Sequence, residues 1–245
     1  MRKTLSLLLS AFLFVFAFIF GSCTKKEDIA LGNVVILGDS YSTFENYIPD
    51  GYNCWYYPNA SYTDVHSVKE TWWHQLIHRT HSQLMLNSSY SGSTICNTGY
   101  DNADVSSSSF VGRITELLNK TDFEKEKVDT LIIYGGLNDY WANAPFGEFI
   151  YENWTKEDLY CIYPAFTYLL STAKQGLPNA RIVVIIEELL GEKMKENLAF
   201  LCQQLDVEYI QPKNISKKNS HPDLLGMDQL TQQIIEYFKA NPITK

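Results

Sequence analysis

The fold of this 245-residue chain is decided by the stretch Asn33-Val34-Val35-Ile36-Leu37-Gly38-Asp39-Ser40. Its apolar run, residues 34–37, is typical of a parallel strand that is buried on both faces. The run leads straight into Gly-Asp-Ser, so the carboxyl end of the strand delivers a hydroxyl to the sheet edge where open α/β folds bind ligands. Ser40 is therefore a candidate nucleophile, although the same tripeptide is also common in turns and helix caps.

Four further apolar segments repeat this strand pattern along the chain. Between them, apolar residues recur at the spacing of helices that pack one face on a sheet. The predicted strands are residues 84–86, 130–134, 181–186 and 207–210. The alternation predicts an α/β fold: a three-layer α/β/α sandwich around a five-stranded parallel sheet with right-handed crossovers.

Polar residues follow the predicted strands at the places where a catalytic site would form. Ser40 follows the first strand, a polar loop with Gly92 the second and Asn138 the third, while His221 comes after the fifth. Parallel strands bring their carboxyl ends to one edge, so these groups can converge. Acyl transfer needs a hydroxyl nucleophile, a base for its proton and N–H donors for the oxyanion. We expect Ser40 as nucleophile, His221 as base, and Ser40 N, Gly92 N and the Asn138 amide as donors.

Four sequence blocks together resemble those of the SGNH (GDSL) hydrolases, a family of esterases and lipases. The blocks are Gly38-Asp39-Ser40, the Gly92 loop, Gly136-Leu137-Asn138-Asp139 and His221-Pro222. The resemblance extends from about residue 33 to residue 238 and implies a flavodoxin-like sheet and an ester hydrolase that needs no cofactor. Asp39 and Asp139 are interpreted as turn-stabilising residues.

One feature of that family is missing from this chain. The usual acid lies three residues before the histidine, and Lys218 stands there. A lysine cannot orient an imidazole or stabilise its cation. Three alternatives remain: Glu187 or Glu188 after the fourth strand, with Glu188 favoured; a Ser-His dyad whose tautomer is fixed by a backbone carbonyl or water; and Asp223, which is more simply a helix cap.

The aromatic residues near these blocks suggest how a substrate is held. Residues 45–64 form a long, aromatic, non-periodic stretch directly after Ser40, and loops of this kind are usually functional. Tyr41 and Trp141 flank the matched blocks and are the substrate-binding candidates, with core packing as the alternative. His74 and His78 have helical i, i+4 spacing but no third ligand, so we expect no metal site.

The N-terminus has the pattern of a secretory signal. Arg2 and Lys3 precede an apolar run over residues 5–20, and Gly21-Ser22 precede Cys23. Residues 20–23 resemble a bacterial lipobox, which implies lipidation at Cys23. We expect a lipoprotein signal peptide over residues 1–22, a tether over 23–32 and a hydrolase domain over 33–245. The protein is then an exported bacterial cell-envelope lipoprotein of the outer membrane or cell surface, with a soluble secreted protein as the alternative.

The charge and composition of the chain limit which classes of partner and which functions are compatible with it. The formal net charge is −8, with no basic block, so nucleic acid is an unsuitable partner. The sequence allows a disulfide bridge between Cys54 and Cys96 but does not establish one. The favoured function is a serine esterase that removes small acyl groups, acetyl above all, from an acylated small molecule or glycan. The alternatives are a non-catalytic glycan-binding lipoprotein on the same fold, or a lipase or thioesterase.

Overall fold

The computed structural model describes residue 29 and residues 31–242. Its centre is a five-stranded parallel sheet with strand order β2-β1-β3-β4-β5. The strands are β1 (Asn33–Gly38), β2 (Gln83–Ser89), β3 (Thr130–Gly135), β4 (Arg181–Ile186) and β5 (Glu208–Ile210). A separate antiparallel hairpin consists of β6 (Lys217–Lys218) and β7 (His221–Pro222). The predicted fold class is confirmed.

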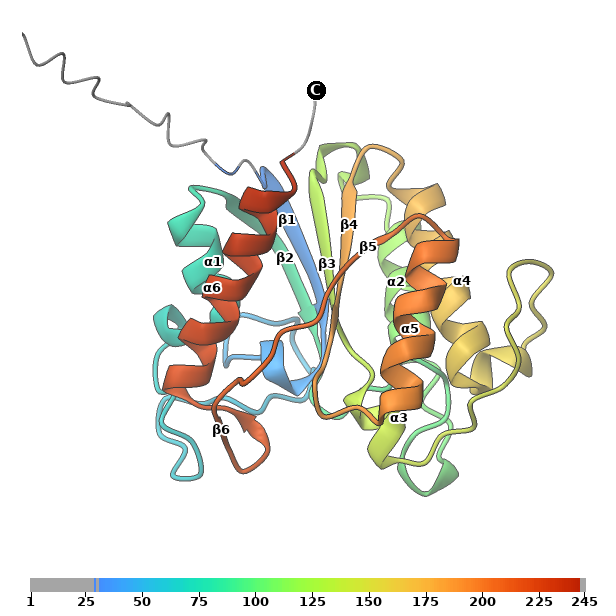
Figure 1. Cartoon of the computed structure of the whole chain (residues 1–245), viewed down its shortest axis with the longest axis horizontal. Coiled ribbons are helices and arrows are strands. Elements are labelled where there is room, and N and C mark those ends of the chain that lie inside the picture. The colour runs from blue at the N-terminus through green and yellow to red at the C-terminus, as the bar shows by residue number, and fades with distance from the viewer. Residues whose placement is uncertain (1–28, 30, 243–245) are drawn as a thin grey trace, which may run out of the picture.

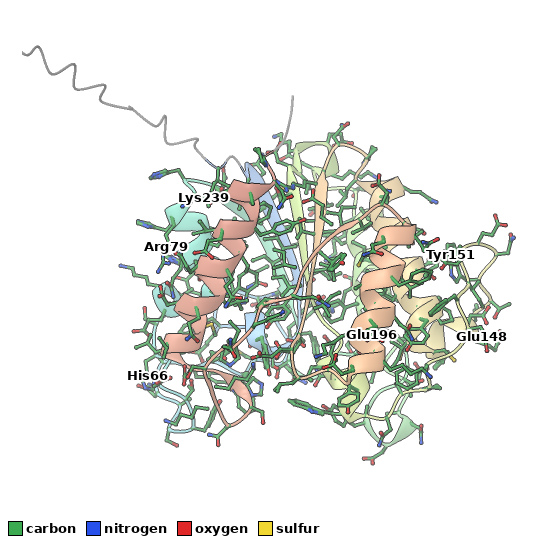
Figure 2. The ribbon with its side chains drawn as sticks, in the orientation of Figure 1. His66, Arg79, Glu148, Tyr151, Glu196 and Lys239 are labelled. Atoms are coloured by element: carbon green, nitrogen blue, oxygen red, sulfur yellow. The ribbon has the colours of Figure 1, made fainter. Side chains whose placement is uncertain are left out.

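Helices cover both faces of the sheet. Figure 1 shows α1 and α6 on one face and α2, α4 and α5 on the other, with α3 at the edge where the strands end. Charged residues such as Arg79 and Lys239 are exposed on the outer sides of α1 and α6 (Figure 2). The helices are α1 (Trp72–Arg79), α2 (Phe110–Asn119), α3 (Leu137–Trp141), α4 (Ile162–Gly176), α5 (Glu192–Gln204) and α6 (Leu224–Ala240). Short 3₁₀ helices lie at Ser40–Ser42, Val68–Glu70, Tyr100–Asn102, Lys125–Lys127 and Asp158–Tyr160.

The apolar runs explain the core. Every residue of β3 is buried, and so is every residue of β1 after Asn33. Helix α1 begins at Trp72 with Thr71 as its N-cap, and Ser67 and Glu70 form a capping box around a separate 3₁₀ turn just before it.

The register of the sheet brings the strand ends together. Gly38 at the end of β1 pairs with Ser89 of β2 on one side and with Tyr134 of β3 on the other. A Cβ at Gly38 would lie 2.5 Å from Ser89 Oγ, so only glycine fits here. The segments after β1, β2 and β3 therefore start side by side, and the β6–β7 hairpin lies at the same edge (Figure 1).

Several expectations concern residues that the structure does not describe. The signal peptide and the lipidation site Cys23 lie outside residues 29 and 31–242, as does most of the tether. Within the described residues, no helix is both long and apolar enough to cross a membrane. Cys54 and Cys96 are free thiols, so the bridge that the sequence left open is not formed.

Candidate active site

A hydroxyl and an imidazole meet at the carboxyl edge of the sheet. Ser40 opens the 3₁₀ turn after β1, and His221 lies in β7. Ser40 Oγ is 2.9 Å from His221 Nε2, and both residues are buried, at 5% and 7% exposure. The structure thus brings together the two residues that the sequence proposes as nucleophile and base.

The other imidazole nitrogen faces a backbone carbonyl. His221 Nδ1 is 2.9 Å from Asn219 O. A carbonyl can only accept, so Nδ1 carries the proton and Nε2 keeps the lone pair that accepts from Ser40 Oγ. The carbonyl is brought there by the two-residue turn of the β6–β7 hairpin, in which Asn219 and Ser220 have φ of 51° and 62°. Two successive positive φ values are typical of a type I′ turn.

The favoured acid, Glu188, is not at the imidazole, and this corrects the sequence-based expectation. Its carboxylate oxygens accept from Asn214 N at 2.7 Å and Ile215 N at 3.0 Å. The second alternative, a dyad with a backbone carbonyl, describes the observed contact. Asp223 caps α6 by accepting from Gly226 N at 2.8 Å, as its simpler interpretation predicted.

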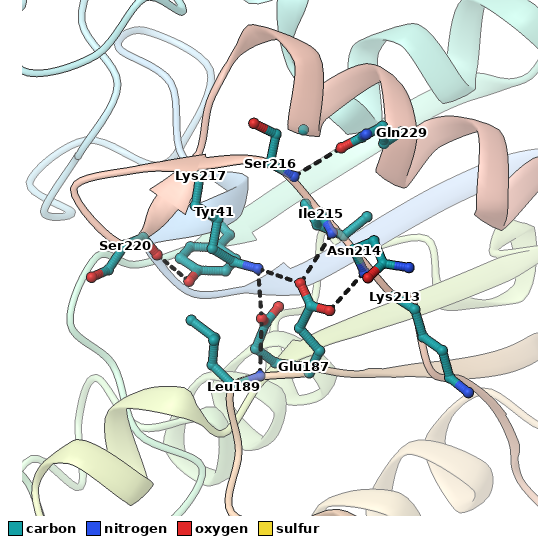
Figure 3. Close-up of polar contacts among 12 residues, drawn as sticks. Tyr41, Glu187, Leu189, Lys213, Asn214, Ile215, Ser216, Lys217, Ser220 and Gln229 are labelled. Atoms are coloured by element: carbon teal, nitrogen blue, oxygen red, sulfur yellow. Dashed lines mark hydrogen bonds and ion pairs between the residues drawn. The ribbon is translucent and has the colours of Figure 1, made fainter.

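Glu187 and Glu188 instead anchor the segment that carries His221. Lys217 Nζ lies 3.0 Å from Glu187 Oε1 and 2.9 Å from Glu188 Oε1 (Figure 3). Glu187 is 2% exposed, and its other oxygen accepts from Tyr134 Oη at 2.6 Å. Because Lys217 pairs with Pro222 across the hairpin, this ion cluster holds the hairpin against the end of β4. The carboxylates thus act on the position of His221 without touching its ring.

Two aromatic side chains enclose the imidazole. The Trp55 indole stacks on His221 with ring centroids 3.6 Å apart and an interplanar angle of 7°. Tyr41 meets the same ring edge-on at 5.0 Å, and its hydroxyl donates to Ser220 O. Burial lowers the pKa of His221 to about 4, against a smaller opposing effect of the Asn219 carbonyl. The imidazole is therefore neutral over the whole neutral pH range.

The candidate oxyanion donors belong to the segments that follow the adjacent strands β1, β2 and β3. Within residues 31–242, the backbone N–H groups of Ser40 and Gly92 donate to no other part of the chain. Gly92 has a φ of 85°, a conformation that glycine adopts without strain. Asn138 Nδ2 donates one N–H to Ser93 O at 3.0 Å, so its second N–H is available to an oxyanion. Asn138 Oδ1 accepts a hydrogen bond from Tyr100 Oη at 2.8 Å. The tyrosine thereby fixes which end of the amide faces Ser93.

The two aspartates of the matched blocks hold backbone, as the sequence suggested. Asp39 Oδ1 accepts from Tyr41 N at 3.0 Å and caps the turn that carries Ser40. Asp139 accepts from Ile95 N at 2.7 Å and from Cys96 N at 3.0 Å, so it ties α3 to the loop that follows Gly92. Burial raises the pKa of Asp139 to about 6.

The two substrate-binding candidates differ in exposure. Tyr41 is 2% exposed and its hydroxyl is occupied, so it supports His221 and does not offer a surface to a ligand; this corrects the expectation. Trp141, at the end of α3, is 41% exposed. Sequence reasoning missed Trp55 as a partner of the imidazole, and also Tyr100 and Arg113. Only Arg113 left a signal, as a charge on the apolar face of a helix.

The arrangement can perform acyl transfer. A neutral imidazole lies within hydrogen-bond distance of the hydroxyl and can accept its proton, and the Ser40 and Gly92 N–H groups have no other acceptor within residues 31–242. Among the described residues, no group of three or more His, Cys, Asp or Glu side chains is placed to hold a metal ion. A parallel α/β sheet with a Ser–His pair at its carboxyl edge is an arrangement that α/β serine hydrolases use.

Comparison with known proteins identifies the family. The model of the GDSL-like lipase/acylhydrolase family matches residues 32–238. A search of curated proteins gives no match. A crystal structure described as a GDSL-like lipase from Bacteroides ovatus is 40% identical, covers 86% of this chain and 100% of its own, and has a TM-score of 0.80. A second one, from Bacteroides uniformis, is 41% identical, covers 86% and 97%, and also has a TM-score of 0.80.

A more distant structure shares the fold. The acetyl xylan esterase Est2A from Butyrivibrio proteoclasticus is 14% identical, covers 85% of this chain and 63% of its own, and has a TM-score of 0.57. The chain belongs to the GDSL-like lipase/acylhydrolase family, and it is an ester hydrolase.

Proposed function

We propose that this protein is a serine esterase that removes small acyl groups, acetyl above all, from carbohydrate. The observation that carries the proposal is the 2.9 Å contact between Ser40 Oγ and His221 Nε2, with Nδ1 held by Asn219 O. This geometry leaves the Nε2 lone pair free to take the Ser40 proton.

The first half-reaction transfers the acyl group to the enzyme. His221 Nε2 takes the Ser40 proton while Oγ attacks the ester carbonyl carbon. The carbonyl oxygen becomes an oxyanion, which accepts hydrogen bonds from Ser40 N, Gly92 N and Asn138 Nδ2. The intermediate collapses when the C–O bond to the alcohol breaks, and the imidazolium returns its proton to the leaving alkoxide.

The second half-reaction restores the enzyme. Water gives a proton to His221 Nε2 and attacks the acyl carbon, and the released Ser40 oxygen regains the proton. During both steps the imidazolium is supported by the Asn219 carbonyl dipole, because no carboxylate reaches Nδ1 within the described residues. A carbonyl carries only a partial negative charge, so it favours the imidazolium less than an acid would.

The choice of substrate rests on the surface beside the site. Tyr140 and Trp141 are 40% and 41% exposed and lie on α3 together with Asn138, so aromatic rings are available for stacking on sugars. Structures that share the fold include carbohydrate esterases, one of them an acetyl xylan esterase. The acetyl group is favoured because Trp55 and Tyr41 fill the space around the imidazole.

The test compares substrates and variants of one purified protein. We expect hydrolysis of p-nitrophenyl acetate and acetylated xylo-oligosaccharides, slower hydrolysis of long-chain p-nitrophenyl esters, and loss of activity in Ser40→Ala. Ser82→Ala is the matched control, because Ser82 contacts Thr80 Oγ1 just before β2, at the opposite end of the sheet. Equal turnover by Ser40→Ala would contradict the assignment of the nucleophile.

Two alternatives have distinct outcomes in the same test. A lipase or thioesterase would turn over long-chain esters or thioesters faster than acetyl esters. A glycan-binding protein without catalysis would bind the oligosaccharide and release no acetate, and its Ser40 would not react with a fluorophosphonate.

We further propose that the enzyme is exported and tethered by a lipid at Cys23. The support is the N-terminal sequence: basic Arg2 and Lys3, the apolar run and the residues before Cys23. Cells that express the full chain should incorporate labelled fatty acid into it, and Cys23→Ser should abolish the incorporation. Equal incorporation by the variant would contradict the tether.

A further inference from the structure

Arg113 is a fully buried arginine on α2 that forms no ion pair with a carboxylate among the described residues. Arg113 is 1% exposed, and its guanidinium lies 4.5 Å above the centroid of the Phe110 ring. A buried charge is strongly unfavourable unless hydrogen bonds or an opposite charge compensate it. An apolar side chain at this place in the helix would avoid that cost.

The compensation comes from oxygen acceptors at the strand ends. Arg113 donates from Nη1 to Ser88 O, from Nη2 to Gly38 O at 3.0 Å and to Ser93 Oγ at 2.9 Å. A fourth bond, from Nε to Ser108 O at 3.0 Å, fixes the guanidinium against the start of its own helix. The planar fork thus bridges β1, β2 and the loop after β2, which a lysine could not do with one ammonium group.

These acceptors lie next to each of the candidate oxyanion donors. Gly38 is two residues before Ser40 in the chain, and Ser93 directly follows Gly92. Ser93 also accepts through its carbonyl from Asn138 Nδ2 at 3.0 Å. One guanidinium therefore connects to the Ser40 turn, the Gly92 loop and the Asn138 amide.

The charge of Arg113 also has the sign that the reaction needs. Negative charge develops on the substrate oxygen in the transition state, and a fixed positive charge in a region shielded from water stabilises it. The guanidinium stays protonated under all ordinary conditions. Without it, the Ser88 and Gly38 carbonyl oxygens would lose a donor, and their partial negative charges would oppose the oxyanion.

We propose that Arg113 is a positioning residue of the esterase, which aligns the three oxyanion donors and places a positive charge behind them. The inference rests on the proposed roles of Ser40, Gly92 and Asn138. It predicts that losing Arg113 lowers kcat and leaves KM nearly unchanged, because the oxyanion exists only in the transition state.

The experiment measures kcat and KM for p-nitrophenyl acetate, the rate of Ser40 phosphonylation by a fluorophosphonate, and Tm. We expect Arg113→Met to lower kcat and the phosphonylation rate about 10- to 100-fold, which is less than outright loss of a donor causes in other enzymes. Arg113→Lys should recover part of the loss. Arg181→Met is the matched control: Arg181 stacks 4.6 Å above Phe238 and pairs with Glu208 at the other end of the sheet, so it should lower Tm and leave kcat unchanged.

The outcomes separate this inference from the proposed function. A folded Arg113→Met protein with the kcat of the wild type would overturn the positioning role. If that variant does not fold, Ser93→Ala decides, because it removes one Arg113 contact and keeps the charge: a several-fold fall in kcat supports the role, and an unchanged kcat overturns it. Failure of the proposed function is seen elsewhere, as activity that persists in Ser40→Ala.

Discussion

Replacing Trp55 by alanine should change the pH dependence of the reaction. The indole covers one whole face of His221 at 3.6 Å, and burial is the main reason that the pKa of His221 is about 4. Against an ordinary histidine pKa of 6.5, this corresponds to about 3 kcal/mol of preference for the neutral ring. Opening that face to water weakens the preference, so the pKa of His221 rises.

The stacking of Trp55 on His221 also has a second effect, which raises the pKa of the imidazole. An aromatic face attracts an imidazolium by cation–π interaction, with about 0.5–2 kcal/mol in favour of the charged form. The preference of about 3 kcal/mol that burial gives to the neutral ring is larger than this attraction, so burial dominates. We therefore expect Trp55→Ala to raise the pKa of His221 by about one pH unit or more, or about 1.4 kcal/mol per unit.

The assay is the pH profile of kcat/KM for p-nitrophenyl acetate, which reports the ionisation of the free enzyme. Only neutral His221 acts as base, so activity falls as the pH drops through its pKa: near pH 4 in the wild type and at higher pH in Trp55→Ala. Trp55→Phe is the control, because it keeps an aromatic ring and because Trp55 Nε1 has no hydrogen-bond partner within the described residues. An acid limb that moves to lower pH in Trp55→Ala, or a wild-type limb near pH 6.5, would refute the reasoning.

Three more predictions follow from the same contacts. Glu188→Gln should keep kcat within about threefold of the wild type, whereas disruption of a true triad acid costs about 10⁴-fold; steady-state kinetics distinguish the two. Asn138→Ala should lower kcat about 100-fold or more with little change in KM, because one oxyanion donor is lost; an equal kcat would remove the amide from the donor set. The His221 contribution to the free energy of unfolding, measured in urea as the difference between the wild type and His221→Gln, should fall as the pH drops from about 6.5 to about 4, since the unfolded chain binds the His221 proton first. The raised pKa values of Asp39 and Asp139 act in the opposite direction in both proteins, so they cancel in this difference. His221→Gln should lack this component of up to about 3 kcal/mol, and an identical pH dependence in that variant would exclude it.

The sheet could be predicted because its determinants are local. Each strand is a short apolar run, and in an α/β fold such runs align in parallel with their carboxyl ends at one edge. That rule predicts that the segments carrying Ser40, Gly92, Asn138 and His221 lie at one edge of the sheet, without knowledge of the strand order. The same rule places Glu188 at the correct edge, which made it a reasonable acid.

The support of the imidazole could not be predicted, because it depends on a turn. Asn219 O reaches Nδ1 only since Asn219 and Ser220 both adopt positive φ, and a serine gives no sequence signal for that conformation. Glu188 does not reach the imidazole because its carboxylate pairs with Lys217 and accepts hydrogen bonds from two backbone N–H groups, those of Asn214 and Ile215, just before the hairpin.

The contacts of Trp55 and Tyr41 around the imidazole could not be predicted from the sequence either. Residues 45–64 have no periodicity, so nothing in the sequence shows that Trp55 folds back onto a histidine that lies in the last third of the chain. Tyr41 is buried because its hydroxyl finds Ser220 O, a partner that exists only after the hairpin has formed.

The central claim is that Ser40 is the nucleophile and that His221 activates it without an acid. Treatment of the wild-type protein with a fluorophosphonate, followed by mass spectrometry of its peptides, tests this claim most directly. We predict one adduct, on Ser40, which forms at the wild-type rate in Glu188→Gln and very slowly in His221→Ala. An adduct on another residue, or a loss of labelling in Glu188→Gln as large as in His221→Ala, would contradict the account.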